Sequence, residues 1–366
     1  MVTRVNRGAI GDVITTLRSG AAPALLSAAL FGASTPLAKL LLRGIDPWML
    51  AGILYLGSGL GLISLRIVSR ALGGIRGAEA PAQGRGWLWL GSAILSGGVV
   101  GPVLLMIGLA RSAAATAALL LNLEGVFTAL LAWFVFRENF DRRIAAGMGA
   151  IVAGGLVLAG GGGDPVGGDP LGPIAIAAAC LAWAIDNNLT RKVSSTDPVR
   201  IAMLKGCVAG AMNVAIARGL RSPWPDPGAL ALAGLVGFAG YGVSLVFFVV
   251  ALRRVGTART GAYFSLAPFF GGAIAVLVLR DAVTLPLVAA GVLMGVGVWL
   301  HRTERHEHAH EHREPGHEHR HAHDEHHQHA HDGSEPPGEP HSHWHAHARL
   351  RHHHRHYPDI HHRHDH

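Results

Sequence analysis

"RSAAATAALLLNLEGVFTALLAWFVFRE" occupies residues 111–138, and "RVGTARTGAYFSLAPFFGGAIAVLVLRD" occupies residues 254–281. The two stretches align at an offset of 143 residues, which places Leu123 on Leu266 and Phe127 on Phe270. Both are apolar over most of their length, and both end on an arginine followed by an acidic residue. The pair therefore indicates that a membrane-spanning unit has been duplicated within the chain.

Ten apolar segments surround and include these two stretches. A hydrocarbon core about 30 Å thick requires about 20 apolar residues of helix. The segments that approach or meet this length are 21–42, 47–68, 87–109, 113–136, 143–160, 173–190, 199–218, 229–252, 257–279 and 285–301. We therefore predict an all-α membrane protein with ten transmembrane helices.

The duplicated unit contains five of these helices. The offset of 143 also places Gly91 on Gly234 and Gly97 on Gly240, and near the start of each half the dipeptide Asp-Pro recurs at residues 46–47 and 197–198. Because five is odd, the second unit must enter the membrane with the opposite polarity. Inverted repeats of this kind are typical of secondary transporters, whose substrate sites lie near the midplane between the repeats.

The predicted organisation has five parts. They are an N-terminal segment (1–20), a first five-helix repeat (21–160), a Gly-rich connection (161–172), a second five-helix repeat (173–300) and a His-rich tail (301–366).

Charge predicts the orientation of the chain. If the N-terminus is cytoplasmic, the inner connections hold 16 Lys and Arg residues and the outer connections hold five. A cytoplasmic excess of Lys and Arg sets membrane orientation, so we expect both termini in the cytoplasm and the protein in the cell (inner) membrane. The basic pI of about 10.1 comes from small groups of charge between apolar segments. This distribution suits a lipid bilayer and excludes a nucleic-acid-binding face.

Three stretches carry a family resemblance. "LLLNLEGVFTALLAWFVFRENF" (119–140), "ALFGASTPLAKLLL" (29–42) and "ACLAWAIDNNLTRKV" (179–193) resemble the EamA family of the drug/metabolite transporter superfamily. The resemblance implies ten helices, cytoplasmic termini, and export or import of small metabolites by alternating access. The chain departs from the family pattern at Gly125, where a proline is usual. The second repeat keeps Pro268 but has Ala267 where the first repeat has Glu124.

Glu124 is the most informative polar residue within the apolar segments. It lies twelve residues into its segment, close to the expected midplane, and Asn122 lies two residues earlier. An ionisable group at the bilayer centre costs at least about 2.5–3.5 kcal/mol, so it suggests a function. Proton coupling or contact with a cationic or amine substrate would suit Glu124. The alternative is a structural Glu that is hydrogen-bonded between helices.

A second polar group comes from the sixth and seventh segments. Asp186 and Asn187 lie in one, Lys205 lies in the other, and their depths from the cytoplasmic end match at about 1.5 Å per residue. We therefore expect Asp186 and Lys205 to form an ion pair or to share one wet cavity. In the alternative, each side chain reaches the interface separately. The family resemblance places Trp183 and Tyr241 on cavity-lining helices, although packing would equally explain both.

The tail differs from the rest of the chain. All 25 His residues lie at or after His301. A segment with almost no apolar residues cannot offset its chain entropy by burial, so we predict disorder. Neutral imidazole suits Zn, Ni, Co and Cu, and alternating His residues offer many combinations of ligands. The candidate ligands are His306, His308, His310, His312, His317, His319, His321, His323, His341, His343, His345 and His347.

Three roles for the tail are consistent with this composition. It could buffer or sense divalent metal and regulate transport, deliver metal into a membrane pathway, or act as a polycation that charges as pH falls. No His occurs in the first 300 residues, so a bare metal ion would find few ligands along the membrane path. We therefore place regulation first and metal cargo second.

The preferred function is a secondary transporter of a small metabolite, with export as the expected direction. One alternative is a transporter of a transition-metal ion or chelate that the tail supplies, and another is a membrane-anchored metal-binding protein. An enzyme is not expected, because the chain has no Ser/His or Cys/His constellation, HExxH motif or phosphate loop. No cofactor is required by this reading, and an oligomer remains open.

Overall fold

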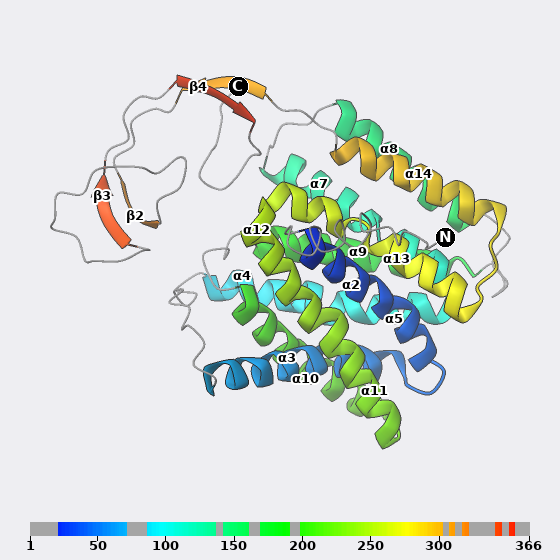
Figure 1. The fold of residues 1–366 in the computed structure, drawn as a ribbon. Helices are drawn as coiled ribbons and strands as arrows, with labels where there is room; N and C mark the ends of the chain where they lie inside the picture. Colours follow the sequence, from blue (N-terminus) through cyan, green and yellow to red (C-terminus); the bar gives the residue numbers. More distant parts are fainter. Residues whose placement is uncertain are drawn as a thin grey trace, which may run out of the picture. The chain divides into compact units, whose positions relative to one another are not determined.

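The structure is a computed structural model of the 366-residue chain. It describes residues 21–71, 86–136, 142–160, 169–190, 198–302, 307–311, 317–321, 341–345 and 351–355. The chain divides into two compact units, Met1–Thr303 and Glu304–His366, whose helices and strands are drawn in Figure 1. The predicted N-terminal segment 1–20 lies outside the described residues, as do residues 161–168 of the Gly-rich connection.

Helices make up all the regular structure described in the first unit. In chain order they are α2 (Ala21–Leu41), α3 (Pro47–Ala71), α4 (Gly86–Ala93), η1 (Ile94–Val100), α5 (Gly101–Arg111), α6 (Ala114–Leu120), α7 (Leu123–Phe136), α8 (Arg142–Gly160), α9 (Leu171–Thr190), α10 (Pro198–Gly219), α11 (Pro227–Gly237), η3 (Phe238–Val243), α12 (Ser244–Phe264), α13 (Ala267–Ile274), η4 (Ala275–Leu279) and α14 (Leu285–Arg302). The three η segments are π-helical turns. η1 and η3 continue directly into α-helix, whereas η4 ends at Arg280, whose backbone is left-handed.

Asp-Pro pairs begin two of these helices. The Asp46 carboxylate accepts a hydrogen bond of 2.9 Å from the backbone N–H of Trp48, at the start of α3. Asp226 accepts one of 2.9 Å from the backbone N–H of Ala229, at the start of α11. In both cases a proline occupies the first helical position, where a missing N–H costs nothing. The sequence thus sets these helix starts locally.

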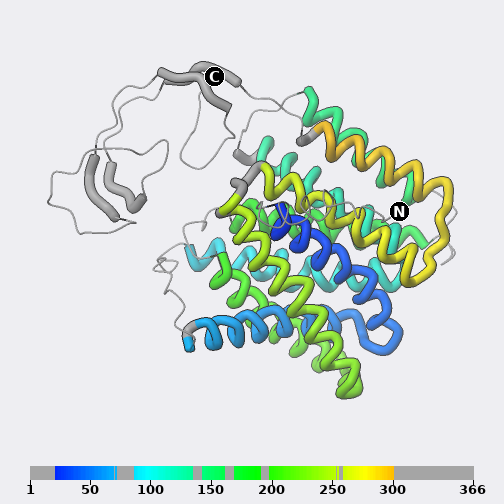
Figure 2. Tube along the Cα trace, viewed as in Figure 1, coloured from blue at the N-terminus to red at the C-terminus, as the bar shows by residue number. Residues whose placement is uncertain are grey.

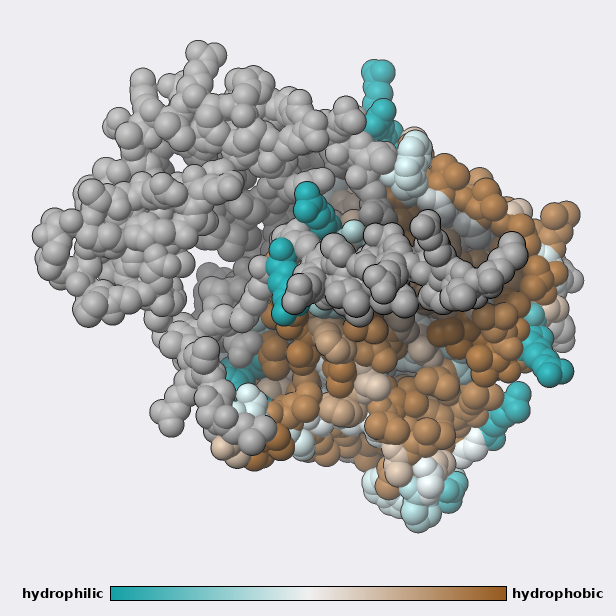
Figure 3. Space-filling model, viewed as in Figure 1, coloured by the Kyte–Doolittle hydropathy of each residue, from teal (hydrophilic) through white to brown (hydrophobic). Residues whose placement is uncertain are grey.

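The number of membrane-spanning helices agrees with the prediction in part. Eight helical stretches in the described residues are long and apolar enough to cross a bilayer. Leu285–Leu300 is a shorter apolar helix. The predicted span 173–190 forms α9, which is 20 residues long but is not among the eight, because Asp186 and its neighbouring asparagines lower its hydropathy. Figure 3 shows that apolar residues cover most of the visible helical surface.

The two repeats pack on each other in a reciprocal pattern. The first helix of repeat one, α2, contacts η3, α12 and α13 of repeat two. The first helix of repeat two, α9, contacts η1, α5 and α7 of repeat one. Helices at equivalent positions also pair with each other, namely α3 with α10 and α8 with α14. Figure 2 shows α2 running beside α12 and α13 although they are more than 200 residues apart in sequence.

Two irregularities recur at the repeat offset. The π-helical segments η1 and η3 lie at equivalent positions in the third helix of each repeat. The fourth helix of each repeat is broken, at Leu121–Asn122 in the first and at Ser265–Leu266 in the second. The predicted single segment 113–136 is therefore two helices, α6 and α7. These shared irregularities support the duplication independently of sequence identity.

The eighth and ninth predicted segments correspond to the membrane-crossing stretches Pro227–Leu252 and Arg259–Leu279, but no helix end lies between them. The sequence predicts one segment ending at 252 and another beginning at 257, but α12 is continuous from Ser244 to Phe264. The interruption comes later, at Ser265–Leu266, just before Pro268. Proline cannot donate a backbone hydrogen bond, and its ring clashes with the carbonyl four residues earlier. For Pro268 that carbonyl belongs to Phe264, the last residue of α12, so the break belongs there and not at the polar residues.

The second unit contains four short strands. They are β1 (Glu307–Glu311), β2 (His317–His321), β3 (His341–His345) and β4 (Arg351–Arg355), paired antiparallel as β1 with β4 and β2 with β3. The composition predicts no regular structure here, so these ladders differ from that expectation. Alternating sequence favours extended backbone, but two-stranded ladders are only marginally stable in water. They do not constitute a packed domain.

Candidate functional site

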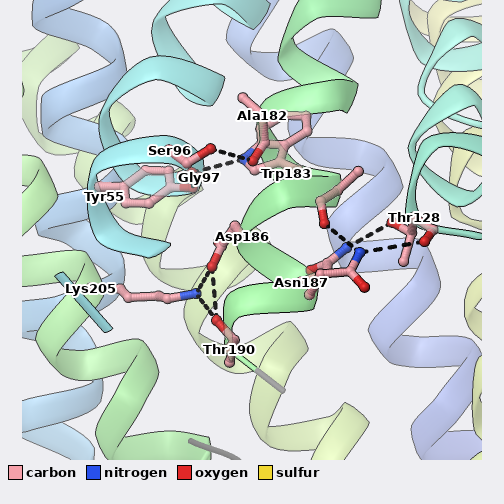
Figure 4. Close-up of polar contacts among 12 residues, drawn as sticks. Tyr55, Ser96, Gly97, Thr128, Ala182, Trp183, Asp186, Asn187, Thr190 and Lys205 are labelled. Atoms are coloured by element: carbon pink, nitrogen blue, oxygen red, sulfur yellow. Dashed lines mark hydrogen bonds and ion pairs between the residues drawn. The ribbon is translucent and has the colours of Figure 1, made fainter. Parts of the chain in front are cut away.

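Helix α9 carries the polar residues of the candidate site. Near its C-terminal end it presents Asp186, Asn187, Asn188 and Thr190. Asp186 and Thr190 are four residues apart and share one face. Figure 4 shows Asp186 directed to one side of α9 and Asn187 to the other. One helix therefore supplies two separate polar clusters.

The first cluster is an ion pair. Lys205 Nζ on α10 contacts Asp186 Oδ1 and donates a hydrogen bond of 2.9 Å to Thr190 Oγ1. Thr190 Oγ1 in turn donates to Asp186 Oδ1 at 2.8 Å. The side chains of Asp186 and Lys205 are only 11% and 17% exposed. The predicted pairing of Asp186 with Lys205 is confirmed.

The space for this carboxylate comes from Gly97 in η1. A Cβ atom at Gly97 would collide with the Asp186 carboxylate. The same glycine offers its carbonyl oxygen to two donors, Tyr55 Oη at 2.9 Å and Trp183 Nε1 at 2.8 Å. Next to it, Ser96 Oγ donates to the Ala182 carbonyl at 2.7 Å. The bonds of Trp183 and Ser96 hold η1, a π-helical turn with shifted backbone hydrogen bonds, against α9, and the bond of Tyr55 holds it against α3.

The second cluster lies between α7 and α9. Asn187 Nδ2 donates a hydrogen bond of 2.8 Å to Glu124 Oε1 and lies 3.4 Å from Thr128 Oγ1. These groups open onto a cavity of about 440 Å³. Its lining residues are Glu124, Gly125, Thr128, Ala129, Ala132, Asn187 and Asn188. Glu124 therefore faces a cavity instead of being enclosed by a neighbouring helix.

The sequence grouped Asn122 with Glu124, but Asn122 does not line the cavity. Asn122 is buried, and its Nδ2 donates to the Leu119 carbonyl at 2.9 Å with Met294 Sδ at 3.8 Å. The break between α6 and α7 leaves that carbonyl without its usual helical partner. Ser265 does the same in the second repeat, where its Oγ donates to the Ala262 carbonyl at 2.9 Å.

Trp183 and Tyr241 have different surroundings. Trp183 is half-buried and hydrogen-bonded to Gly97, as described above. Tyr241 packs in an aromatic group, with its ring centroid 5.8 Å from those of both Phe31 and Tyr55. Neither residue is among those that line the α7–α9 cavity.

The sequence interpretation missed four site residues, and two of them left a usable signal. Thr128 is four residues after Glu124, so helical spacing alone puts the two on one face. Thr190 stands in the same relation to Asp186. Tyr55 and Ser96 left no comparable signal, because their role depends on the carbonyl geometry of η1 and α9.

The repeat-related counterpart of the α7–α9 interface is closed. It lies between α13 and α2, where Ala267 and Gly271 take the positions of Glu124 and Thr128. A Cβ at Gly32 would collide with the Ala267 carbonyl oxygen and would lie 3.0 Å from Gly271 N. The two helices therefore meet backbone to backbone at this point, and Ala267 is fully buried.

The candidate metal ligands of the tail fall into two groups. Eight lie in β1, β2 and β3, namely His308, His310, His317, His319, His321, His341, His343 and His345, and His306, His312, His323 and His347 lie outside the described residues. In the register of β2 and β3, His319 stands opposite His343. Among the residues whose side chains the structure describes, no three His, Cys, Asp or Glu residues gather where they could hold a metal ion.

Known proteins resemble this chain over both repeats. A model described as the EamA-like transporter family matches residues 18–160 and 170–303. An "Uncharacterized transporter" of Methanothermobacter thermautotrophicus is 26% identical over 288 residues, covering 74% of this chain and 82% of that protein. A Pseudomonas fluorescens protein, "Probable 4-amino-4-deoxy-L-arabinose-phosphoundecaprenol flippase subunit ArnE", is 41% identical over 73 residues, covering 20% of this chain and 61% of that protein.

Structural similarity points the same way. A solved crystal structure matches the fold with a TM-score of 0.56 at 20% identity, covering 77% of this chain and 98% of that one. At this identity the match shows a common fold and nothing more. The match of the family model to both repeats, on the two-repeat helical fold just described, shows that the chain belongs to the EamA-like transporter family.

Proposed function

We propose that this membrane transporter moves a small metabolite by alternating access, with the α7–α9 cavity as its substrate site. The observation that carries the proposal is the contrast between two equivalent interfaces. The α7–α9 interface is polar and holds a cavity of about 440 Å³, and the α13–α2 interface is closed by backbone contact at Gly32. Inverted repeats can exchange such open and closed interfaces between two states.

The proposed direction is export. The cavity lies near the C-terminal end of α9 and along the first ten residues of α7. The two helices lead into the connections at 191–197 and 137–141. In the orientation that the Lys and Arg distribution favours, both connections are cytoplasmic. A cavity open to that side would load solute from the cytoplasm, with both termini of the chain on the same side of the cell membrane.

Flux in reconstituted vesicles tests this function. Proteoliposomes loaded with a defined mixture of amino acids, polyamines and organic acids would be sampled over time by mass spectrometry. We expect at least one solute to leave faster than from empty liposomes, and Glu124→Gln to slow it by about tenfold or more, since a lost ionic hydrogen bond has that effect. Asp169→Asn, which changes an exposed carboxylate paired with Arg111, is the matched control. No solute-specific flux from any loaded class would contradict the proposal.

For the tail we propose that the His residues buffer or sense Zn, Ni, Co or Cu and regulate transport. The support is the chemistry of repeated imidazoles, together with the confinement of all 25 His residues to positions from 301 onwards. The described helices contain no gathering of metal-ligating side chains. This favours a regulatory role over metal ions as cargo.

Metal content and tolerance of a host lacking its own exporters would separate these roles. The full chain, a truncation after Arg302 and Glu124→Gln would be compared across the four metals. If truncation alters only tolerance and Glu124→Gln leaves metal content unchanged, the tail buffers or senses metal. If both variants abolish a fall in cell metal, a metal ion or chelate is the cargo, and the regulatory proposal is wrong.

A further inference from the structure

The α7–α9 cavity has a surplus of hydrogen-bond acceptors. Asn187 Nδ2 is already engaged with Glu124 and Thr128. Asn188 Nδ2 donates to the Ala184 carbonyl at 2.9 Å and lies 3.4 Å from the Thr128 carbonyl. Both amide nitrogens are thus directed at protein acceptors. Each amide oxygen and the second carboxylate oxygen of Glu124 remain without a donor among the described residues.

The charge of the cavity is also uncompensated. Of the described residues that line it, Glu124 is the one that can ionise. Lys205 lies on the opposite face of α9, where it is held by Asp186 and Thr190. A carboxylate within the membrane is costly unless it is paired or hydrogen-bonded. A positively charged ligand would supply the missing partner.

The size and walls of the cavity distinguish between kinds of cation. About 440 Å³ is within the range of sites for organic molecules, about 300–1,000 Å³, and far exceeds the volume of one bare ion. Gly125, Ala129 and Ala132 form small apolar walls, which leave room for a carbon chain beside the carboxylate.

We propose that the α7–α9 cavity binds a small organic molecule through a protonated primary amine, with Glu124, Asn187 and Asn188 accepting its N–H groups. The inference rests on the proposed function, because it names the chemical class of the ligand for the same cavity. A primary ammonium has three N–H donors and no acceptor, which is the complement of this lining. A carboxylate or phosphate ligand would instead face Glu124 without a cation among the described residues that line the cavity.

Binding of a matched set of probes tests the inference. Full-length protein in lipid nanodiscs would be titrated calorimetrically with N-acetylputrescine and N-acetylcadaverine, which carry one primary ammonium. The comparison probes are N-butylacetamide, which is neutral, 4-acetamidobutanoate, which is anionic, and the trimethylammonium form of N-acetylputrescine, which keeps the charge but has no ammonium N–H. We expect the primary amines to bind about tenfold or more tightly than every comparison probe.

Two variants assign the binding to the cavity. Glu124→Gln should weaken binding of the primary amines by about tenfold or more, and Asp169→Asn should leave it unchanged. The inference is overturned if no primary amine binds, if the anionic or trimethylated probe binds equally well, or if Glu124→Gln has no effect. A different result would separate the two proposals. If a solute without an amine still crosses the proteoliposome membrane in a Glu124-dependent manner, the amine proposal is wrong and the proposed transport function is retained.

Discussion

The first helices of the two repeats, α2 and α9, occupy equivalent positions but have opposite chemistry. Helix α9 meets its partners through Asp186, Asn187 and Asn188, which form an ion pair on one side and line a cavity on the other. Helix α2 meets the equivalent partners at Gly32, where α13 approaches backbone to backbone. The duplication has therefore kept the packing and divided the polar chemistry unequally.

The difference assigns separate tasks to the two halves. Polar side chains in a membrane are costly and need fixed partners, so a single set at one interface is less expensive than two. The close contact at Gly32 stabilises its interface by dispersion between small residues, as is usual between membrane helices. Such a contact can open without exposing a charge, which suits a moving gate. In the proposed function, the α9 side binds the solute.

The largest expected effect follows from breaking the ion pair of α9. Asp186→Asn would leave the Lys205 ammonium buried without its counter-ion, and Lys205→Met would leave the Asp186 carboxylate. Each single change should lower the free energy of unfolding by about 3–5 kcal/mol, as is found when one member of a buried pair is removed. Thermal unfolding of the protein in nanodiscs would measure the loss.

The double variant Asp186→Asn/Lys205→Met distinguishes pairing from a separate role for either residue. Because it leaves no unpaired charge, it should recover most of the stability that each single variant loses. Additive losses in the double variant would show that the two charges act independently, despite the contact between Lys205 Nζ and Asp186 Oδ1.

The next effect concerns the closed interface of α2. Gly32→Val would force α2 and α13 apart, since even a Cβ collides with the Ala267 carbonyl. We expect a loss of about 1–3 kcal/mol in stability, the usual cost of overpacking, and a loss of solute flux, because the gate could no longer close. Gly149→Ala on α8, where a Cβ would meet nothing within 4 Å, is the control and should leave both unchanged. Wild-type flux in Gly32→Val would show that closure of α2 against α13 at Gly32 is not required for transport.

A smaller effect tests the break that both repeats share. Asn122→Ala and Ser265→Ala each remove a side-chain hydrogen bond to a carbonyl freed by the break, at Leu119 and Ala262 respectively. Each should cost about 1 kcal/mol of stability, the typical net value of such a bond. The solute concentration for half-maximal flux should stay unchanged in both. A shift in that concentration for Asn122→Ala alone would show that Asn122 contributes to substrate binding.

The sequence predicted the features that depend on hydropathy and on matched depth. The offset of 143 predicted two equivalent helical repeats, and the depths of Asp186 and Lys205 predicted their contact. These inferences succeed because a bilayer fixes the height of each residue along its helix. In a membrane-spanning helix, the position of a residue in the sequence therefore gives its depth in the bilayer.

Rotation about the helix axis and local hydrogen bonding could not be predicted in this way. Asn122 is near Glu124 in sequence, but the break between α6 and α7 turns it towards Leu119 and Met294. Lys39 Nζ donates to the Leu109 carbonyl at 2.6 Å, a contact that its position in the sequence does not predict. A cation there complements the C-terminal carbonyls of α5. Both contacts depend on backbone carbonyl groups that are available as acceptors, and the amino-acid sequence does not show which carbonyls are available.

The smallest expected effect concerns the carbonyl of Gly97, which anchors η1 to α9. Trp183→Phe removes one of its two donors, but Tyr55 Oη remains at 2.9 Å. Either Trp183→Phe or Tyr55→Phe should therefore cost about 0.5–1.5 kcal/mol, the net value of one hydrogen bond. The double variant leaves the carbonyl without a side-chain donor, so its cost should exceed the sum of the two single changes. Thermal unfolding of the four proteins measures this coupling. A strictly additive result would mean that η1 is held mainly by packing against α9. The α9 interface would then resemble the close-packed interface of α2 at Gly32 more than its hydrogen bonds indicate.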